Sequence, residues 1–369
     1  MSNLNLNLLG VLSTPNRCYS IVEKRVLIIL ILSVCACSNS SDLDNYVPVP
    51  LVVDVPSNFP EMVYNLENNQ VTEAGFELGK KLFYEGKLSV NNAVPCAFCH
   101  EQAFAFTHHE HTVSHGLNGG VGKRNAQPIQ NLAYQSEFMW DGAATHLDLQ
   151  PIIPITSDIE MGETLSNVIS KLKADSYYQN QFGKAFEDGA INSENMLKAL
   201  SQFMIMMVSS NSKYDKYVRN EDNITLTQKE LDGLETFQNK CASCHATDLF
   251  TDESYRNTGL PVNPRLNDNG RYDVFENPDD LYKFKVPSLR NVEKSNPYMH
   301  DGRFQTLEAV LEFYASGMVD NGGLIDPVFK KPDGTLGLIF SDYEKESLIA
   351  FLKTLTDNEF LTDERFSEF

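Results

Sequence analysis

Apolar residues recur at three- and four-residue steps in two stretches that lie far apart in the chain, residues 73–86 (EAGFELGKKLFYEG) and 227–240 (TQKELDGLETFQNK). This spacing predicts a helix with one buried face in each stretch. Thr227 and Glu230 form a capping-box pattern at the start of the second helix. Residues 193–210 are strongly apolar and predict a third helix, whose methionine cluster is interpreted as core filling rather than a ligand set. Few segments alternate at period two, so the pattern predicts a mainly α fold.

Each of the first two predicted helices precedes a Cys-x-x-Cys-His motif. The motifs are CAFCH, with Cys96, Cys99 and His100, and CASCH, with Cys241, Cys244 and His245. In a c-type haem site the two thiols bind the vinyl groups and the histidine is the proximal iron ligand. The alternative is one zinc site built from both cysteine pairs, but the long interval between Cys99 and Cys241 is unlike that of a zinc ribbon. The motifs therefore predict two covalently bound haem c groups.

A second pattern also occurs twice, once after each haem motif. Asparagine precedes Asp-Gly by ten residues, and Leu-Asp or Leu-Glu follows, at residues 131–148 and again at 291–308. The simplest explanation is an internal duplication that yields two tandem cytochrome c-like haem domains. We place them at residues 58–217 and 218–369. The second copy holds extra residues after its haem motif, where NPRLNDNGRYDVFENPDD predicts a loop.

The two copies differ at matched positions. Trp140 matches His300, Pro154 matches Tyr314, and Glu160 matches Asp320. Proline cannot ligate iron whereas tyrosinate can, so the first haem is expected to stay open and the second to be closed. Glu160 over an open haem would be an acid/base group for O–O cleavage. The alternatives are a solvated surface carboxylate for Glu160 and a core aromatic for Trp140.

The N-terminus has the pattern of an export signal. Lys24 and Arg25 precede an apolar run, residues 26–34, that is too short to span a bilayer, and the run ends at VCACSNSSD. This end resembles a bacterial lipoprotein cleavage site, with Cys37 as the lipidation candidate and Cys35 or an ordinary signal peptide as alternatives. We therefore predict a signal peptide at residues 1–36, a tether at 37–57, and a lipid-anchored location on the periplasmic side of the envelope.

Charge narrows the set of partners. The chain has 369 residues and a formal net charge of −20, which disfavours nucleic-acid binding because phosphates would be repelled. A basic partner protein and simple solubility both remain open as explanations of the acidity. Contact with the membrane is expected only through the lipid anchor.

The haem motifs, together with residues 124–134 (RNAQPIQNLAY), 138–162 (FMWDGAATHLDLQPIIPITSDIEMG) and 284–314 (FKVPSLRNVEKSNPYMHDGRFQTLEAVLEFY), resemble the bacterial dihaem cytochrome c peroxidase family. This family includes the dihaem enzyme that matures the tryptophan-derived quinone of methylamine dehydrogenase. The resemblance implies a cytochrome-c peroxidase that reduces hydrogen peroxide with electrons from a small donor protein, a cytochrome c or a cupredoxin. Family members commonly form dimers, so the resemblance also implies a homodimer.

The resemblance assigns roles to single residues. The haem at His100 would be peroxidatic and the haem at His245 would receive and store electrons, with Trp140 as the relay between them. Gln150, Pro154 and Glu160 would form the distal pocket, with Glu160 as acid/base. A calcium site is implied at the side chain of Asn125 and the main-chain carbonyls of Ser295 and Pro297.

The resemblance leaves alternatives for the second axial ligand of each haem iron. His115 occupies the place of a loop histidine that closes the first haem in many family peroxidases, while His108, His109 and His111 nearby are interpreted as surface histidines. Ordinary family peroxidases have methionine where this chain has Tyr314, and the methylamine-related enzyme has tyrosine. Met318, one helical turn further on, is the alternative to Tyr314. Two other functions also stay open, oxidation of a protein substrate and electron carriage by two closed haems without catalysis.

Overall fold

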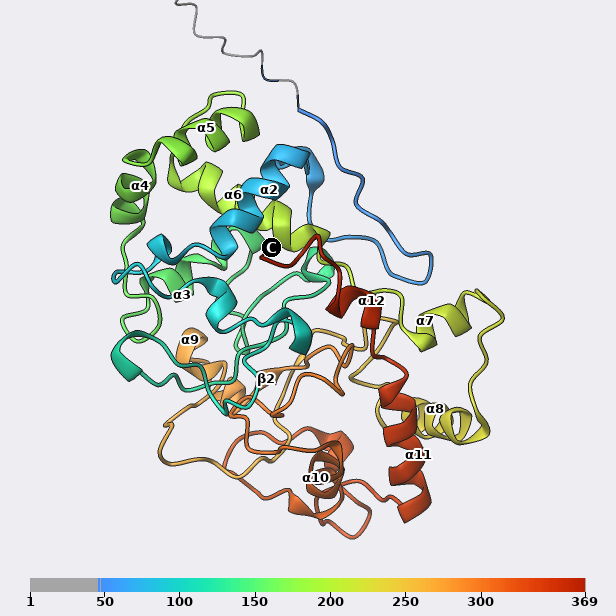
Figure 1. The fold of residues 1–369 in the computed structure, drawn as a ribbon. Coiled ribbons are helices and arrows are strands. Elements are labelled where there is room, and N and C mark those ends of the chain that lie inside the picture. The colour runs from blue at the N-terminus through green and yellow to red at the C-terminus, as the bar shows by residue number, and fades with distance from the viewer. Residues whose placement is uncertain (1–45, 47, 369) are drawn as a thin grey trace, which may run out of the picture. The chain divides into compact units, whose positions relative to one another are not determined.

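The fold is mainly helical with little sheet, as the sequence pattern predicts (Figure 1). It was obtained as a computed structural model that describes residues 46 and 48–368. The predicted signal peptide, Cys37 and the first part of the predicted tether lie outside the described residues. The rest of the tether contacts the chain near Val71: the N–H of Leu51 donates to the carbonyl of Val71 at 2.9 Å. Within the part of the chain that is described, none of the helices has the length and apolar character of a membrane span.

Besides several short 3-10 turns, the regular structure of the described residues consists of α-helices, one π-helical turn and one pair of two-residue strands. The helices are α2 (Glu73–Phe83), α3 (Ile152–Thr156), α4 (Leu165–Lys173), α5 (Ser176–Ala185), α6 (Ser193–Met206), α7 (Lys213–Val218), α8 (Gln228–Lys240), α9 (Tyr272–Phe275), α10 (Leu307–Glu312), α11 (Asp342–Lys353) and α12 (Asn358–Leu361). A π-helical turn, Phe313–Gly317, continues α10. Strand β1 (Tyr255–Arg256) pairs antiparallel with β2 (Phe284–Lys285).

Two helix pairs, α2 with α6 and α8 with α11, form the framework (Figure 1). The predicted capping box is confirmed at the start of α8, where Thr227 and Glu230 bond reciprocally. Glycine permits the close approach in both pairs. A Cβ on Gly79 of α2 would lie 1.9 Å from the carbonyl oxygen of Ala199 in α6. A Cβ on Gly233 of α8 would lie equally close to the carbonyl oxygen of Ser347 in α11.

Each helix pair has its own hydrophobic core. One cluster surrounds α2, α5 and α6, and a second lies between α8 and α11. A smaller third cluster comprises Leu260, Phe313, Met318, Ile325 and Phe329. The predicted role of the methionines of residues 193–210 is confirmed, since Met196, Met204 and Met207 are buried in the first cluster.

The two copies of the repeated frame share a backbone conformation. Asn131 and Asn291 both have φ of 57°, a left-handed conformation that asparagine adopts more readily than most residues. The side-chain oxygen of each accepts a hydrogen bond from the segment that follows a long helix. The donor is the N–H of Ser209 after α6 at 2.9 Å, and the N–H of Asp357 after α11 at 2.7 Å. Each asparagine thus ties its frame to the end of a helix pair.

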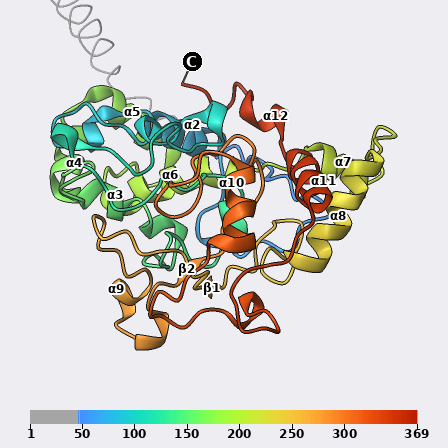
Figure 2. The ribbon, with the colours of Figure 1, turned by 90° about the horizontal axis from the view of Figure 1, so that it is seen from below.

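The extra segment of the second copy is mostly irregular, as predicted, with the one-turn helix α9 in it. Figure 2 shows α9 beside the β1–β2 pair, where the N–H of Arg271 donates to the carbonyl of Lys283 at 2.9 Å. Asp268 accepts two hydrogen bonds from the guanidinium of Arg124, each 2.7 Å. Arg271 also donates to the carbonyl of Asp141 at 2.9 Å. The segment therefore braces the loop that carries Trp140.

Candidate active site

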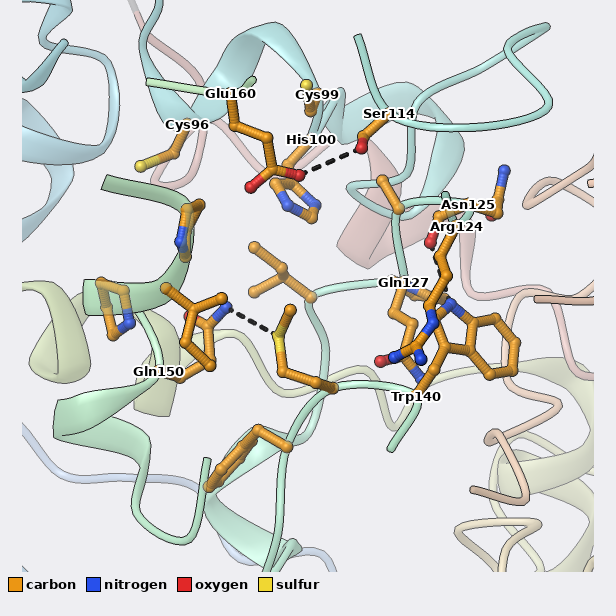
Figure 3. Close-up of a pocket in the computed structure, with 18 of the residues that line it drawn as sticks. Cys96, Cys99, His100, Ser114, Arg124, Asn125, Gln127, Trp140, Gln150 and Glu160 are labelled. Carbon is orange, nitrogen blue, oxygen red and sulfur yellow. Dashed lines mark hydrogen bonds between the residues drawn. The ribbon is translucent and has the colours of Figure 1, made fainter. Parts of the chain in front are cut away.

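The residues of the first haem motif open onto a cavity of about 410 Å³ (Figure 3). The structure brings together there nearly all of the site residues that the sequence predicts for the first haem. The cavity is lined by Cys96, Cys99, His100, His115, Trp140, Gln150, Pro154 and Glu160. Pro154 lies in α3, Cys96 lies in the short turn that precedes His100, and the other residues come from connecting segments.

Both motif histidines are held in one tautomer by the backbone. Nδ1 of His100 lies 2.6 Å from the carbonyl oxygen of Phe106, and Nδ1 of His245 lies 3.0 Å from that of Phe250. A carbonyl can only accept, so Nδ1 carries the proton and Nε2 keeps its lone pair. Burial lowers the pKa of both imidazoles, which keeps them neutral. A neutral imidazole with its second nitrogen hydrogen-bonded is the form that ligates iron.

The four cysteines of the motifs are free thiols. Burial raises the pKa of Cys96, Cys99 and Cys241 to about 12, and it also raises that of Cys244. Cys96 and Cys99 line one cavity and Cys241 and Cys244 line another, whereas a zinc site built from both pairs would need the four thiolates together. Paired neutral thiols at the edge of a roomy cavity, each pair next to an oriented histidine, fit the covalent attachment of haem c.

Glu160 lies on the cavity wall and its carboxylate points into the cavity (Figure 3). The hydroxyl of Ser114 donates a hydrogen bond to Oε1 of this carboxylate at 3.0 Å. Burial raises the pKa of Glu160, and the hydrogen bond from Ser114 partly offsets this shift. Glu160 is half-buried and lines the cavity. Glu160 can hold or release a proton nearer neutral pH than an exposed glutamate can.

In the histidine-rich segment that begins at Thr107, the prediction that His108 is a surface histidine is wrong. The side chain of His108 is not on the surface: the residue is 3% exposed, and its Nδ1 has no hydrogen-bond partner. Its ring stacks on His111 with centroids 4.0 Å apart, and His111 in turn contacts His115 at 4.6 Å. Burial lowers the pKa of His108 to about 4. Consecutive polar residues carry no periodicity, so sequence alone could not place this ring inside.

The second haem motif faces another cavity, of about 220 Å³. Cys241, Cys244, His245 and Tyr314 line it. Tyr314 lies in the π-helical turn, and burial raises the pKa of its hydroxyl. Met318, the alternative ligand, does not line this cavity and packs in the third hydrophobic cluster instead. The geometry therefore brings Tyr314, rather than Met318, to the second motif.

Trp140 belongs to the walls of both cavities. Its indole N–H donates to the carbonyl of Asn125 at 2.9 Å, and its own carbonyl accepts from the N–H of Lys285 at 2.7 Å. Residues 285–288 also line both cavities, so this strand end and Trp140 together form the wall between the two sites. His300, its counterpart in the other copy, lines only the second of these two cavities and stacks on Phe284 at 3.6 Å.

The residues predicted to bind calcium lie together. Asn125, Ser295 and Pro297 all line the second cavity. The side-chain amide of Asn125 donates to the carbonyls of His111 and Thr112, at 3.0 and 3.4 Å, and its backbone N–H donates to that of His300 at 2.7 Å. The calcium site itself stays a prediction.

Sequence reasoning missed two residues of the site. Ser114 bonds Glu160 across 46 positions of the chain, and the side chain of Lys285 is buried beside Trp140. Lys285 lies in one of the segments that carried the family resemblance, which was the only signal available for it. A serine followed by a histidine has no distinguishing pattern, and the contact of Ser114 depends on the fold.

Two Cys-x-x-Cys-His motifs on separate cavities, one cavity also lined by Glu160 and the other by Tyr314, are the arrangement expected of a dihaem c-type oxidoreductase. A family model described as di-haem cytochrome c peroxidase matches residues 73–223. The chain is 34% identical over 307 residues to the methylamine utilization protein MauG of Methylorubrum extorquens, covering 80% of this chain and 82% of that protein. The chain belongs to this family, and membership implies two haem c groups.

Other relatives in this family are named as peroxidases. The chain is 32% identical to the cytochrome c551 peroxidase of Nitrosomonas europaea, covering 77% of this chain and 80% of that protein. A solved structure of a MauG-like protein associated with microbial copper homeostasis matches with a TM-score of 0.76 and 30% identity. That match covers 86% of this chain and 99% of the other.

Proposed function

We propose that this protein reduces hydrogen peroxide to water with electrons from a small donor protein, a cytochrome c or a cupredoxin, as a cytochrome-c peroxidase. The observation that carries the proposal is the position of Glu160, a half-buried carboxylate that points into the first cavity beside His100 (Figure 3). The matched position in the second copy, Asp320, is exposed and lines neither cavity. When bound, the two haems supply an iron that accepts peroxide and a store for electrons.

Glu160 moves the proton. It takes a proton from one oxygen of the bound peroxide and delivers it to the departing oxygen, so that the O–O bond breaks heterolytically. Burial raises the pKa of Glu160, so both transfers are accessible nearer to neutral pH than they would be for an exposed glutamate. Ser114 orients the carboxylate through its hydroxyl. Two electrons and two further protons complete the conversion of one peroxide to two water molecules.

Pro154 and Gln150 shape the space in which peroxide binds. Pro154 has no atom that can ligate iron, so it leaves the face opposite His100 free. Gln150 is a polar wall residue whose amide contacts the sulfur of Met139 at 3.6 Å. His115 is the loop histidine that we assign to this site, because it lines the cavity and His108, His109 and His111 do not. Trp140 relays electrons from the second site, which Tyr314 closes.

The remaining assignments complete the proposal. The shared conformation of the two asparagine frames supports an internal duplication, with haem domains at residues 58–217 and 218–369. The placement of Asn125, Ser295 and Pro297 around one cavity supports a calcium ion there. The lipoprotein signal supports a lipid-anchored periplasmic protein. A homodimer is the proposed assembly.

A second function, oxidation of a protein substrate, is favoured by one observation. Tyr314 lines the second cavity where ordinary family peroxidases have methionine, and tyrosinate stabilises ferric iron. The relative named methylamine utilization protein MauG is 34% identical to this chain. Turnover of peroxide with a reduced cytochrome, without change in any protein residue, would argue against this second function.

The test of peroxidase function is Glu160→Gln, with Asp158→Asn as the matched control. Asp158 is an exposed carboxylate two residues away that does not line the cavity. We expect Glu160→Gln to lower peroxide turnover by roughly 100- to 10,000-fold, the usual size of general acid–base catalysis, and Asp158→Asn to leave it unchanged. Unchanged turnover in Glu160→Gln, or no turnover in the parent with both haems attached, would favour a dihaem electron carrier.

A further inference from the structure

A buried lysine stands in the wall between the two cavities. The side chain of Lys285 is 4% exposed, and the residue lines both the first and the second cavity. Its backbone N–H holds the carbonyl of Trp140, so the lysine belongs to the same wall as the proposed relay. Lysine is almost never this buried unless its charge is paired.

The partner of this charge is Glu253. Nζ of Lys285 lies 3.0 Å from Oε2 of Glu253 and also donates to the side-chain oxygen of Gln135 at 3.2 Å and to the carbonyl of Glu137. Glu253 is fixed in turn by the N–H and the hydroxyl of Ser136, at 3.0 and 3.1 Å. All three hydrogens of the ammonium group are therefore used.

The two residues of this ion pair differ in their position relative to the cavities. Lys285 lines both cavities, whereas Glu253 lines neither. The residue that carries the cation therefore belongs to the wall of both cavities, and the residue that carries its counter-charge belongs to neither wall. Burying an ion pair commonly stabilises a fold less than apolar side chains of similar size would. A packing role alone does not explain why a charge occupies this wall.

We propose that Lys285 is a positioning residue for electron transfer, whose charge stabilises an added electron in both haem cavities and whose place is fixed by Glu253. This inference rests on the proposed function, because it takes two haems as the electron store. An electron that enters either site adds one negative charge, and a buried cation nearby is screened far less than a surface one. The electron that crosses from the second site to the first by way of Trp140 stays within reach of the same cation.

The test is spectroelectrochemical titration of the holoprotein at pH 6, chosen well below the ordinary pKa of a lysine amine because burial lowers the pKa of Lys285. Lys285→Met removes the cation and keeps the length of the side chain, and Glu253→Gln removes the anion and keeps a hydrogen-bonding group. Lys283→Met is the matched control, because Lys283 lies two residues away, pairs with Asp280 at 3.6 Å and lines neither haem cavity. Haem content is measured for each variant.

We expect Lys285→Met to lower the midpoint potentials of both haems and Glu253→Gln to raise them. At a fixed applied potential this appears as a several-fold change, in opposite directions, in the ratio of reduced to oxidised haem. Lys283→Met should match the parent. Shifts in the same direction for the two variants, or none in either, would overturn the proposal.

Failure of this inference can be told from failure of the proposed function. If the parent turns over peroxide but neither variant moves a potential, only the role of Lys285 is wrong. If the parent binds two haems and has no peroxide turnover, the proposed function is wrong. Should Lys285→Met fail to take up haem, Glu253→Gln decides alone: raised potentials support the proposal, and unchanged potentials overturn it.

Discussion

The two haem cavities have the same kinds of residue at the Cys-x-x-Cys-His motif and different residues on the rest of the wall. On the proximal side each has two free thiols and a histidine whose Nδ1 binds a backbone carbonyl, of Phe106 in one and Phe250 in the other. Elsewhere on its wall the first cavity has Pro154 and the half-buried Glu160, and the second has Tyr314. The comparison teaches that the two sites share the residues for haem attachment and differ in a few other wall residues, which in the proposed function decide their chemistry.

The largest effect is expected from making the first cavity resemble the second. Pro154→Tyr introduces a hydroxyl that can ligate iron where the chain now has none. We expect it to lower peroxide turnover as much as loss of Glu160 does, by roughly 100-fold or more. Pro154→Ala, which adds no ligand, is the control and should remain active. Steady-state peroxide reduction with both haems counted is the measurement. Full activity of Pro154→Tyr would mean that this position does not face the iron.

The reverse change should open the second cavity. Tyr314→Phe removes the hydroxyl that we propose as the ligand of the second iron and keeps the ring, so the variant should bind two molecules of carbon monoxide per reduced chain where the parent binds one. Met318→Leu is the matched control, and it should leave the stoichiometry at one. A parent-like stoichiometry in Tyr314→Phe together with a doubled one in Met318→Leu would show that Met318 is the ligand.

A smaller effect is expected at the wall between the cavities. Trp140→Phe keeps an aromatic ring but loses the indole N–H that binds the carbonyl of Asn125. Both haems should remain attached, and electron transfer from the second to the first should slow several-fold in a stopped-flow experiment on the half-reduced protein. A rate equal to that of the parent would return Trp140 to the role of a core aromatic.

The smallest effect concerns pH. Burial raises the pKa of Glu160, and the hydroxyl of Ser114 lowers it by stabilising the carboxylate. Glu160 must be deprotonated to accept a proton from peroxide, so kcat/KM should fall as the pH drops through this pKa. Ser114→Ala should move this acid limb to higher pH, and Ser114→Thr, which keeps the hydroxyl, should move it less. A limb at lower pH in the alanine variant would contradict the assignment of Glu160.

Much of the framework could be predicted because its signals are local. The three helices foreseen at residues 73–86, 193–210 and 227–240 are present as α2, α6 and α8, and the capping box of Thr227 lies where it was expected. Apolar periodicity and a cap act within a few residues, so a single sequence records them. The close contact at Gly233 left no such record, because its partner Ser347 lies in a distant helix.

The site was predictable in its chemistry but not in its contacts. The motif cysteines and histidines, Glu160 and Tyr314 could be named because repetition of the frame marks them. The burial of His108 and the charge pair of Lys285 with Glu253 could not, since both depend on how loops from separate parts of the chain meet. Partners in such pairs are chosen by the fold rather than by neighbours in sequence.

The central claim is that one haem is open and catalytic while the other is closed by Tyr314. The most direct test follows a single sample by EPR and optical spectroscopy, fully oxidised and then half-reduced, with peroxide added last. We expect two haems, one of them with tyrosinate ligation that peroxide does not displace, and a second that reacts with peroxide. Two haems that both keep a sixth protein ligand and fail to respond to peroxide in either state would contradict the account.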